Sequence, residues 1–409
     1  MNGPLSGLKV LCLAQVISAP SGARLLADLG ATVIKIEPPQ GDVMRTITPR
    51  ATDDRGVEQS GFFIALNAGK KGVAVDLKRP EGSAIVRRLA LEWADVFVEN
   101  FTPGTLERYQ LDYESLHEHN PRLVYASLTG YGHGNAMSKR RAYDISVQGE
   151  SGLTSMNGEE GRRPHRIGYS VADYGAGRDM VIGILAALYH RERTGRGLFV
   201  DSAMYDTCVA LTENAIPRYS MKGEVARALG NRHPAACPHN LFRTKDGFVN
   251  IIAIDDRLFT KLTQAMERPD LLEDPEMATA VRRLGCRDRV EGLVEAWTSQ
   301  RTTAEVVAKL EAHGLAAGVL RDIEAVVEDP QTEARALAPE VHQPHLGPLR
   351  VPGCPIKFGG ADAGVAGPAP LLGEHNREVL SGILGMSDGE IDALRAGGVL
   401  ADETPRPRA

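Results

Sequence analysis

Short β-branched and other apolar runs alternate with longer stretches of helical periodicity over roughly the first 200 residues of the chain. The apolar runs predict strands at residues 10–15, 32–37, 73–77, 96–98 and 123–127, with one more at 198–201. The periodic stretches predict helices at residues 21–30, 82–93 and 178–193. Because parallel strands need long, usually helical connections, this alternation is typical of a parallel sheet with crossover helices. We therefore predict an α/β fold with a Rossmann-like large domain whose first part covers residues 1–224.

The pattern changes after about residue 223. An irregular segment at residues 230–239 precedes an expected strand-turn-strand at 242–252, centred on Asp246-Gly247. Amphipathic helices are expected at residues 255–266, 287–300 and 303–313. We interpret residues 225–325 as a smaller α+β domain inserted into the large one.

Two common kinds of cofactor site do not fit the sequence. The turn after the first predicted strand lacks the Gly-x-Gly-x-x-Gly pattern with which Rossmann domains bind dinucleotides. The 11 histidines include no His-x-x-x-His or His-Glu-x-x-His pair, and the 5 cysteines no Cys-x-x-Cys pair. We expect no dinucleotide, no metal and no permanently bound cofactor.

The charge and hydropathy of the chain argue against two classes of binding partner, nucleic acids and membranes. The 409-residue chain has a formal net charge of −6, which argues against nucleic-acid binding, although local basic clusters can still hold a phosphorylated ligand. It contains no uninterrupted apolar stretch of about 18 residues, and its N-terminus lacks the layout of a secretion signal. We expect no membrane partner and a cytoplasmic protein.

Asp173 is the first candidate for chemistry. It lies in the segment 167–177, which contains Gly175 and Gly177, just before the apolar run at residues 180–188. Glycines let the backbone turn sharply and let a bulky substrate approach, and a following helix would direct N–H groups toward a carboxylate or an oxyanion. From the local sequence alone, Asp173 is either a nucleophile or an ordinary helix N-cap.

Several blocks in sequence order resemble family III CoA-transferases, the group that includes formyl-CoA and carnitine CoA-transferases. These are residues 7–11 and 26–37, 67–71 with 75–78, 94–104, Tyr143-Asp144 through Gln148 and Gly152, and 190–197. The resemblance spans roughly the first 210 residues and places Asp173 at the position of the family's nucleophile. It also implies that residues 326–409 return to complete the large domain, and that the chain forms an interlocked, ring-like homodimer.

The resemblance implies a reaction and its residues. Coenzyme A and acyl-CoA are expected as substrates, and Asp173 is expected to form a mixed anhydride and then an aspartyl-CoA thioester. Tyr143 matches a tyrosine near the nucleophile, where it can hydrogen-bond a reacting carboxylate. Candidate coenzyme A ligands at family positions are Lys78, Asn100, Phe101 and Arg108; Arg45 is a plausible further phosphate ligand, and Arg141 belongs to a basic patch that holds phosphates or the acid.

The choice of acid rests on departures from the formyl-CoA transferase pattern. Ile17 stands where that branch has a glutamine, and Pro38 where it has an arginine, so formate and oxalate are not expected. Two basic patches flank the nucleophile in sequence, at residues 139–141 and 162–166. We hypothesise that part of this charge binds the distal carboxylate of a dicarboxylic acid, with succinyl-CoA as a possible donor; phosphate binding or solvent exposure are the alternatives.

Two other functions stay open at this point. An α-methylacyl-CoA racemase shares the fold, but racemases of this type have a histidine where the chain has Tyr143, and a racemase needs two acid/base groups. The chain could also be a CoA-binding subunit of a heteromeric transferase. Such subunits lack the nucleophile, whereas Asp173 is present.

Overall fold

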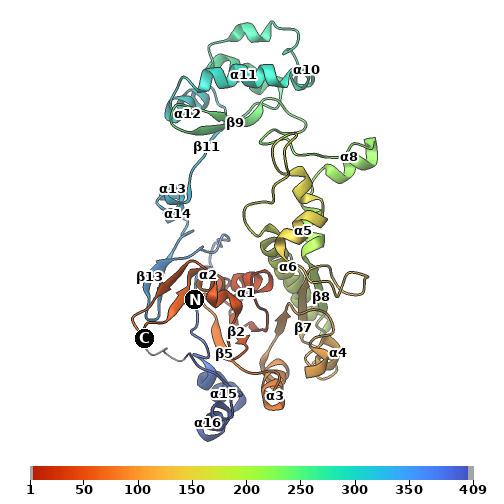
Figure 1. Cartoon of the computed structure of the whole chain (residues 1–409), viewed down its shortest axis with the longest axis vertical. Helices are drawn as coiled ribbons and strands as arrows, with labels where there is room; N and C mark the ends of the chain where they lie inside the picture. Colours follow the sequence, from red (N-terminus) through yellow and green to blue (C-terminus); the bar gives the residue numbers. More distant parts are fainter. Residues whose placement is uncertain (1–2, 404–409) are drawn as a thin grey trace. The chain divides into compact units, whose positions relative to one another are not determined.

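The structure, a computed structural model, describes residues 3–403. The chain forms two compact units, whose elements are labelled in Figure 1. Unit 1 joins the chain up to Leu153 with Ile167–Glu213 and the part from Pro330 onward, and unit 2 joins Thr154–Arg166 with Asn214–Asp329. Unit 2 thus includes the segment Thr154–Arg166, which the sequence pattern left in the first domain. The predicted domain ranges stay a prediction, and their ends at residues 1–2 and 404–409 lie outside the described residues.

Unit 1 is built on a parallel sheet, which confirms the predicted α/β class. The sheet has the strand order β5-β2-β1-β6-β7-β8 within residues 3–403, and every neighbouring pair is parallel. Its strands are β1 (Lys9–Cys12), β2 (Thr32–Glu37), β5 (Lys71–Ala74), β6 (Val96–Glu99), β7 (Val124–Thr129) and β8 (Phe199–Ala203). The direction in which strands are added reverses between β1 and β6, and in open α/β sheets such a switch point opens a crevice at the carboxyl ends of the strands.

The helices and small strands of unit 1 surround this sheet. The longer helices are α1 (Ser18–Asp28), α3 (Pro80–Arg88), which continues as the π-helical turn η2 (Leu89–Trp93), α6 (Val171–Thr194), α15 (Asn376–Leu384) and α16 (Asp388–Ala396). The shorter elements are η1 (Val43–Thr46), β3 (Arg50–Thr52), β4 (Glu58–Ser60), α2 (Gly61–Asn67), η3 (Glu107–Tyr109), α4 (Tyr113–His117), α5 (Asp144–Glu150), α7 (Met204–Ala210), α14 (Pro330–Ala334), β12 (Glu340–Gln343) and β13 (Gly347–Arg350). The short turn η4 (Leu153–Met156) begins at the last residue of the first segment of unit 1, and its other residues belong to unit 2. No helix in the described part of the chain is both long and apolar enough to cross a membrane.

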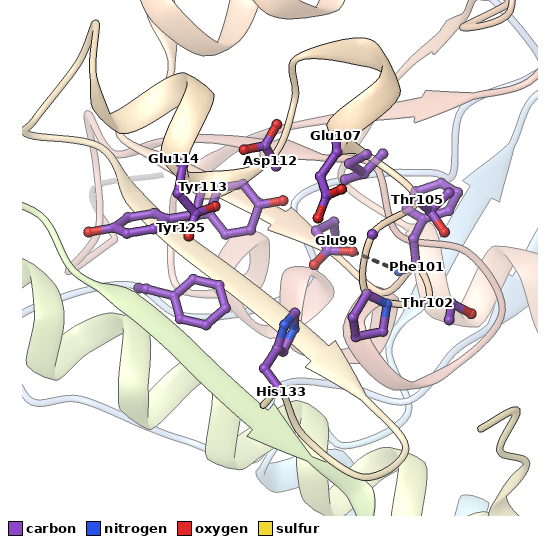
Figure 2. Close-up of a pocket in the computed structure, with 14 residues that line it drawn as sticks. Glu99, Phe101, Thr102, Thr105, Glu107, Asp112, Tyr113, Glu114, Tyr125 and His133 are labelled. Carbon is purple, nitrogen blue, oxygen red and sulfur yellow. Dashed lines mark hydrogen bonds between the residues drawn. The ribbon is translucent and has the colours of Figure 1, made fainter. Parts of the chain in front are cut away.

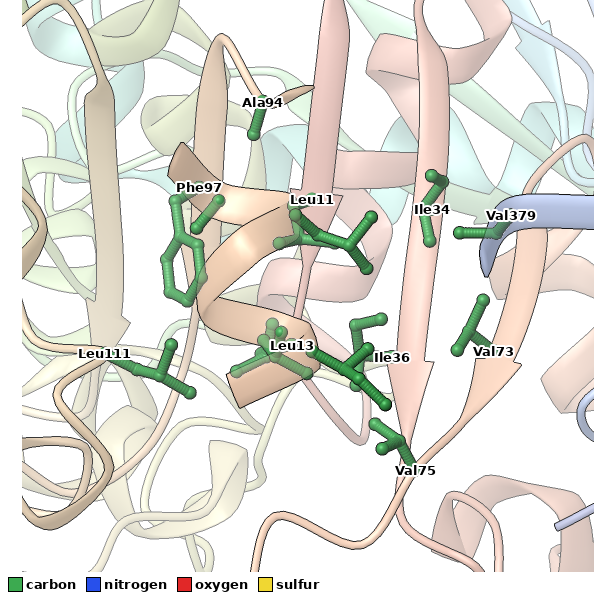
Figure 3. Close-up of a cluster of buried hydrophobic side chains, with 14 of the residues drawn as sticks. Leu11, Leu13, Ile34, Ile36, Val73, Val75, Ala94, Phe97, Leu111 and Val379 are labelled. Carbon is green, nitrogen blue, oxygen red and sulfur yellow. The ribbon is translucent and has the colours of Figure 1, made fainter. Parts of the chain in front are cut away.

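One face of the sheet forms the main core of unit 1. Figure 3 shows Leu11, Ile34, Val73 and Phe97 projecting from successive strands into one apolar cluster, with Val379 contributed by α15. These side chains are at most 1% exposed. The strands therefore read as continuous apolar runs because helices cover the sheet on both faces, as is usual for parallel sheets.

Unit 2 contains the predicted strand-turn-strand. It is formed by the antiparallel pair β9 (His239–Arg243) and β10 (Phe248–Ile252), to which β11 (Ala317–Val319) adds on the other edge. The helices are α8 (Ala215–Lys222), α9 (Asp256–Ala265), α10 (Ala280–Gly285), α11 (Arg287–Thr298), α12 (Thr303–Ala312) and α13 (Ile323–Val327), with the short turn η5 (Pro269–Leu272). Phe242, Phe259 and Leu310 are buried in a separate apolar core. Unit 2 thus combines an antiparallel sheet with helices, and the predicted inserted domain at residues 225–325 stays a prediction.

The predicted start of one helix is wrong, and the error concerns the site. Helix α6 begins at Val171 and not at residue 178, so Gly175 and Gly177 lie inside the helix and not in a turn. Gly177 is needed for contact with α1, because a Cβ there would lie 2.6 Å from the carbonyl oxygen of Ser18 and 2.5 Å from Oγ of Ser21. The glycines therefore reflect a close helix crossing, which sequence periodicity alone does not reveal.

Candidate active site

At the switch point, the side-chain amide of Asn100 joins the loop after β6 to the loop after β1, and we call this contact the amide clamp. After β1 and β6 end, Asn100 Oδ1 accepts a hydrogen bond from the backbone N of Gln15 at 2.9 Å, and Asn100 Nδ2 donates to the carbonyl oxygen of Gln15 at 2.7 Å. The Asn100 side chain is thus used to join the two loops. Sequence reasoning assigned it to coenzyme A, whereas the structure gives it two backbone partners.

Three predicted coenzyme A ligands line one cavity beside this clamp. The cavity has a volume of about 370 Å³, within the usual range of small-molecule sites. Lys78 enters it from the connection after β5, Phe101 from the connection after β6, and Arg108 from η3. Gln15 also lines the cavity, although the sequence analysis did not select it. Residues far apart in sequence therefore bring two cations and an aromatic ring to the carboxyl edge of the sheet.

A second hollow extends this cavity on its basic side. It has a volume of about 690 Å³ and shares Thr105 and Arg108 with the first. Lys139 lies in its wall together with Gly134 and Asn135. Its charged lining residues are the cations Arg108 and Lys139 and one carboxylate, Glu107, so cations outnumber anions and the hollow suits phosphate groups better than an all-acidic one.

A third hollow on the other side of the same loop is acidic. Figure 2 shows Glu99, Glu107, Asp112 and Glu114 around it, with aromatic side chains below them, and its volume is about 260 Å³. Burial raises the pKa of Glu99 to about 7, although Glu99 Oε2 accepts a hydrogen bond from the backbone N of Phe101 at 2.7 Å. Within the described residues, this hollow has four carboxylates and no Lys or Arg in its wall, so a polyphosphate is better accommodated by the two hollows in which Lys or Arg side chains stand beside the carboxylates.

Arg45, the further predicted phosphate ligand, lies in a different environment. Its Nη2 and Nε contact Glu37 at 2.7 and 2.8 Å, its Nη2 donates to the carbonyl oxygen of Pro370 at 3.1 Å, and its guanidinium lies 3.7 Å from the centre of the Phe63 ring. Burial opposes ionisation of Glu37, but Arg45, together with Lys35 and the backbone N of Asp42, lowers the pKa of that carboxyl. These contacts tie η1 to β2, and the phosphate-binding role predicted for Arg45 stays a prediction.

Two of the predicted site residues, Arg141 and Tyr143, have exposed side chains. The Arg141 side chain is exposed, and within residues 3–403 it makes no polar contact. The Tyr143 side chain is 72% exposed, and its hydroxyl has no hydrogen-bond partner in the same described range. The neighbouring Arg140 is engaged, since it contacts Glu150 at 2.5 Å and lies over the ring of Tyr131.

Asp173 lies in the first turn of α6 with a buried carboxylate. It is 8% exposed, and its carboxylate has no hydrogen bond or ion pair within residues 3–403. The pKa of Asp173 is raised from 3.8 to about 7, chiefly by burial and further by the charge of Asp144. The N-cap is Ser170, so the interpretation of Asp173 as a helix cap is wrong. A buried carboxylate without partners costs stability, and such groups are typical of chemical sites.

Two residues that the sequence analysis did not select hold the backbone next to Asp173. Asp144 Oδ1 accepts a hydrogen bond from the backbone N of Ala172 at 2.9 Å, and Asp144 Oδ2 accepts one from Gln148 Nε2 at 2.6 Å. Asp144 is 9% exposed and Gln148 is fully buried. The available signal was a polar pair four residues apart on a short helix next to Tyr143, but such a pair is common on helix surfaces.

The remaining predicted cations belong to unit 2. Arg162, Arg163 and His165 are exposed there, in the segment Thr154–Arg166. The structure therefore assigns the two basic patches of the sequence to different units, with residues 139–141 in unit 1. Among residues 3–403, no cluster of three or more His, Cys, Asp and Glu side chains has the arrangement of a metal site.

Comparison with known proteins identifies the class. The profile of CoA-transferase family III matches residues 5–376, and the chain therefore belongs to CoA-transferase family III. A CaiB/BaiF family protein from Brucella suis has a similar solved structure, with a TM-score of 0.83 at 36% identity over 94% of this chain and 100% of that one. The chain is accordingly an enzyme, a CoA-transferase.

Three relatives of known activity show which acids similar enzymes are named for. The chain is 34% identical to succinyl-CoA–D-citramalate CoA-transferase of Chloroflexus aurantiacus, over 96% of this chain and 97% of the relative. It is 37% identical to succinyl-CoA:mesaconate CoA-transferase of Haloarcula hispanica, over 92% and 96%. It is 35% identical to the β subunit of succinyl-CoA–L-malate CoA-transferase of Chloroflexus aurantiacus, over 96% and 97%. All three relatives are named for succinyl-CoA and a second carboxylic acid.

Proposed function

We propose that this enzyme transfers coenzyme A from succinyl-CoA to a second dicarboxylic acid, with Asp173 as the nucleophile. The observation that carries the proposal is the Asp173 carboxylate, which is buried, has no partner within residues 3–403 and has a pKa raised to about 7. A carboxylate that hydrogen bonds do not stabilise is a better nucleophile than a solvated one. The names of the relatives support succinyl-CoA as the donor and a dicarboxylate as the acceptor.

In the proposed reaction, each acyl transfer passes through the Asp173 carboxylate. An oxygen of Asp173 attacks the thioester carbon of succinyl-CoA, the C–S bond breaks, and a mixed anhydride and the CoA thiolate form. The thiolate then attacks the Asp173 carbonyl, which releases succinate and leaves an aspartyl-CoA thioester. The incoming carboxylate attacks this thioester to form a second anhydride. The released thiolate attacks its acyl carbon, which gives the new acyl-CoA and restores Asp173.

Coenzyme A is proposed to occupy the two hollows that share Arg108. Lys78, Arg108 and Lys139 would contact its phosphates, and Phe101 would contact the adenine or the pantetheine arm. Asn100 would act through Gln15, whose backbone it holds. Arg45 is committed to Glu37, so its contribution is expected to be structural.

The exposed groups near α5 are proposed to meet the acid. Arg141 and Tyr143 have no polar side-chain partner within residues 3–403, and both are available to a carboxylate. A cation such as Arg141 suits the distal carboxylate of a C4–C5 dicarboxylic acid. The exposed apolar side chains of α6, Ile182 at 66% and Tyr189 at 67%, support the proposal that the enzyme is a homodimer. Light scattering on the purified chain tests the dimer.

The reaction is tested by following CoA products and a trapped intermediate together. Purified enzyme is incubated with succinyl-CoA and a panel of mono- and dicarboxylic acids, and in parallel with succinyl-CoA and hydroxylamine. The proposal predicts new acyl-CoA products with dicarboxylates and an Asp173 hydroxamate, both lost in Asp173→Asn. Asp179→Asn is the matched control, because Asp179 is an exposed carboxylate on the same helix. Products with monocarboxylates at equal rates would overturn the dicarboxylate assignment.

One observation favours a second assembly. A relative at 35% identity is named a β subunit, so a CoA-transferase of this kind can need a second chain. In that case the purified chain would form neither products nor hydroxamate, and adding a homologous second subunit would restore both. Turnover by the chain alone excludes this alternative.

A further inference from the structure

Helix α5 provides the polar contacts that hold the entry to α6. The backbone N of Ala172 in the first turn of α6 donates to Asp144 Oδ1 at 2.9 Å, and the backbone N of Ile167 donates to Gln148 Oε1 at 2.8 Å. Gln148 Nε2 also donates to Asp144 Oδ2 at 2.6 Å and lies 3.5 Å from the carbonyl oxygen of Tyr169. Two side chains of one helix thus fix the backbone on both sides of Ser170.

These contacts replace a local cap. The first N–H groups of a helix have no partner within it and are normally satisfied by the side chain of the N-cap residue. Ser170 is the N-cap of α6, and its side chain makes no capping hydrogen bond within the described part of the chain. Asp144 therefore caps α6 from another helix, and the residue after the capped Ala172 is Asp173.

We propose that Asp144 and Gln148 are positioning residues that hold the first turn of α6 so that Asp173 attacks the thioester. The proposal rests on the proposed function of Asp173 as the nucleophile. Both residues are buried, Asp144 at 9% and Gln148 at 0% exposure. Gln148 uses its carbonyl for Ile167 and its amide for Asp144, so its orientation is fixed by both partners. Loss of either residue releases one end of the segment.

Asp144 also contributes charge to the site. Burial is the first cause of the raised pKa of Asp173, and the negative charge of Asp144 is the second. Other ionisable groups around Asp173 are Tyr174 on α6 and Cys208 on α7, both with a pKa raised first by burial, and Arg24 on α1 acts on Tyr174 in the opposite sense. Among these, Asp144 is the carboxylate whose removal lowers the pKa of Asp173.

Two variants separate position from charge. Asp144→Asn removes the charge and also places an amide donor against Gln148 Nε2, so it disturbs both. Gln148→Met keeps the Asp144 charge and a similar volume, but it removes the contacts to Ile167 and Tyr169 and the hydrogen bond to Asp144 Oδ2. Asp206→Asn is the control, because it removes an exposed carboxylate of α7 that is not among the causes of the Asp173 shift.

The experiment measures the Asp173 titration and the steady-state kinetics of each folded variant. The carboxyl resonance of Asp173 in ¹³C-aspartate-labelled full-length enzyme, identified by its loss in Asp173→Asn, is followed from pH 4 to pH 9. Asp144→Asn is expected to move its midpoint to lower pH by about one unit, and Gln148→Met to leave it unchanged. Both are expected to lower kcat about 100-fold with the KM for succinyl-CoA retained, whereas Asp206→Asn changes neither.

The outcomes are distinguishable from those of the proposed function. Wild-type kcat in folded Gln148→Met, or an unshifted Asp173 midpoint in Asp144→Asn, overturns the positioning proposal while transfer by the wild type stands. If the wild type fails to transfer coenzyme A with any donor, the proposed function fails. The titration still decides the role of Asp144, because it needs no turnover. If Asp144→Asn does not fold, Gln148→Met carries the test through its kcat.

Discussion

Two buried carboxylates of unit 1, Asp42 and Asp173, lie in opposite environments. Asp42 is 1% exposed and accepts hydrogen bonds from Lys35 Nζ at 2.8 Å, from the backbone N of Met44 at 3.0 Å and from that of Val16 at 3.3 Å. Asp173 is 8% exposed and has no hydrogen-bond or ion-pair partner in the part of the chain described here. The paired carboxylate stabilises a turn, whereas the unpaired one costs stability and remains available to a substrate.

The turn that Asp42 holds is itself strained. Val16 adopts a φ of +67°, a conformation that β-branched residues rarely take, and it lies between β1 and α1. Lys35 Nζ also donates to the carbonyl oxygen of Ala14 at 2.9 Å, so one fully buried ion pair fixes both sides of Gln15. Pairing of charges at one place therefore fixes a loop that lines the cavity, whereas at the other place the carboxylate has no partner within residues 3–403.

The largest expected effect comes from removing the unpaired carboxylate. Asp173→Asn is expected to lower kcat by about 10⁴-fold, because an amide cannot form the acyl intermediates. The loss is measured as the amount of new acyl-CoA formed in reactions quenched at set times. The control variant Asp179→Asn is expected to remain active. A variant that retains more than a tenth of the wild-type kcat would contradict the nucleophile assignment.

The same variant has a pH signature in stability. The pKa of Asp173 is about 7 in the folded chain against an ordinary value of 3.8, so the unfolded chain ionises first as the pH rises. Wild-type stability is therefore lost, relative to Asp173→Asn, as the pH rises from about 4 to about 7, and the difference is constant above that. Urea unfolding of both proteins at pH 4.5 and pH 8 measures it. An equal difference at the two pH values would show that Asp173 is not perturbed.

Breaking the paired carboxylate should affect stability more than chemistry. Lys35→Met leaves Asp42 buried without its cation and is expected to lower the free energy of unfolding by about 3–5 kcal/mol. Urea unfolding at 25 °C measures the loss, and the folded fraction should still form the Asp173 hydroxamate. The exposed pair Arg88–Glu92 serves as control, since Arg88→Met should cost at most about 1 kcal/mol. A loss below that in Lys35→Met would remove the contrast between the two carboxylates.

The close crossing of α1 and α6 involves the helix that carries Asp173, and a substitution at Gly177 widens it directly. In Gly177→Ala, the new Cβ would meet the backbone of Ser18 at 2.6 Å, so the helices must separate. We expect about 1–3 kcal/mol of destabilisation and a lower kcat, because Asp173 lies one turn earlier on the same helix face. Thermal unfolding and kcat are compared with Gly292→Ala, where nothing lies within 4 Å of a new Cβ and a small stabilisation is expected. An unchanged kcat in Gly177→Ala would show that the spacing of α1 and α6 does not affect catalysis by Asp173.

The smallest effects concern substrate binding. Arg108→Ala and Lys78→Ala are each expected to raise the KM for succinyl-CoA about tenfold with kcat retained, because both cations line the cavity. Arg45→Ala should instead lower stability and leave that KM unchanged, because Arg45 contacts Glu37 and Pro370. Initial-rate kinetics and urea unfolding on the three variants distinguish the two roles. A raised KM in Arg45→Ala alone would reverse the assignment.

Sequence patterns predicted what depends on local order. The strand at residues 32–37 was placed at its observed bounds, because its apolar run is interrupted by turn residues at both ends. Lys78, Phe101 and Arg108 were selected by the family resemblance, and the parallel topology brings all three to one cavity. The class of enzyme followed from the same ordered blocks and is confirmed by the family match.

What the sequence did not predict depends on contacts between distant segments. The start of α6 was misplaced because Gly175 and Gly177 resemble turn residues in the sequence. The structure shows that Gly177 instead allows close contact between α6 and α1. Arg45 contacts Glu37 and Asn100 contacts the backbone of Gln15, and a motif does not reveal these partners; their assignment to coenzyme A stays a prediction. The capping of Ala172 by Asp144 joins two helices across 28 positions, and no local rule anticipates it.

The most direct test of Asp173 as nucleophile follows the oxygen atoms of the acceptor acid. An acceptor dicarboxylate labelled with ¹⁸O in its carboxylates is incubated with succinyl-CoA and enzyme, and the peptide that contains Asp173 is analysed by tandem mass spectrometry. The proposed reaction cleaves the second anhydride at the acyl carbon of the acceptor, so one ¹⁸O is predicted to remain in the Asp173 carboxylate after turnover. Formation of the new acyl-CoA without ¹⁸O in Asp173 would contradict the account.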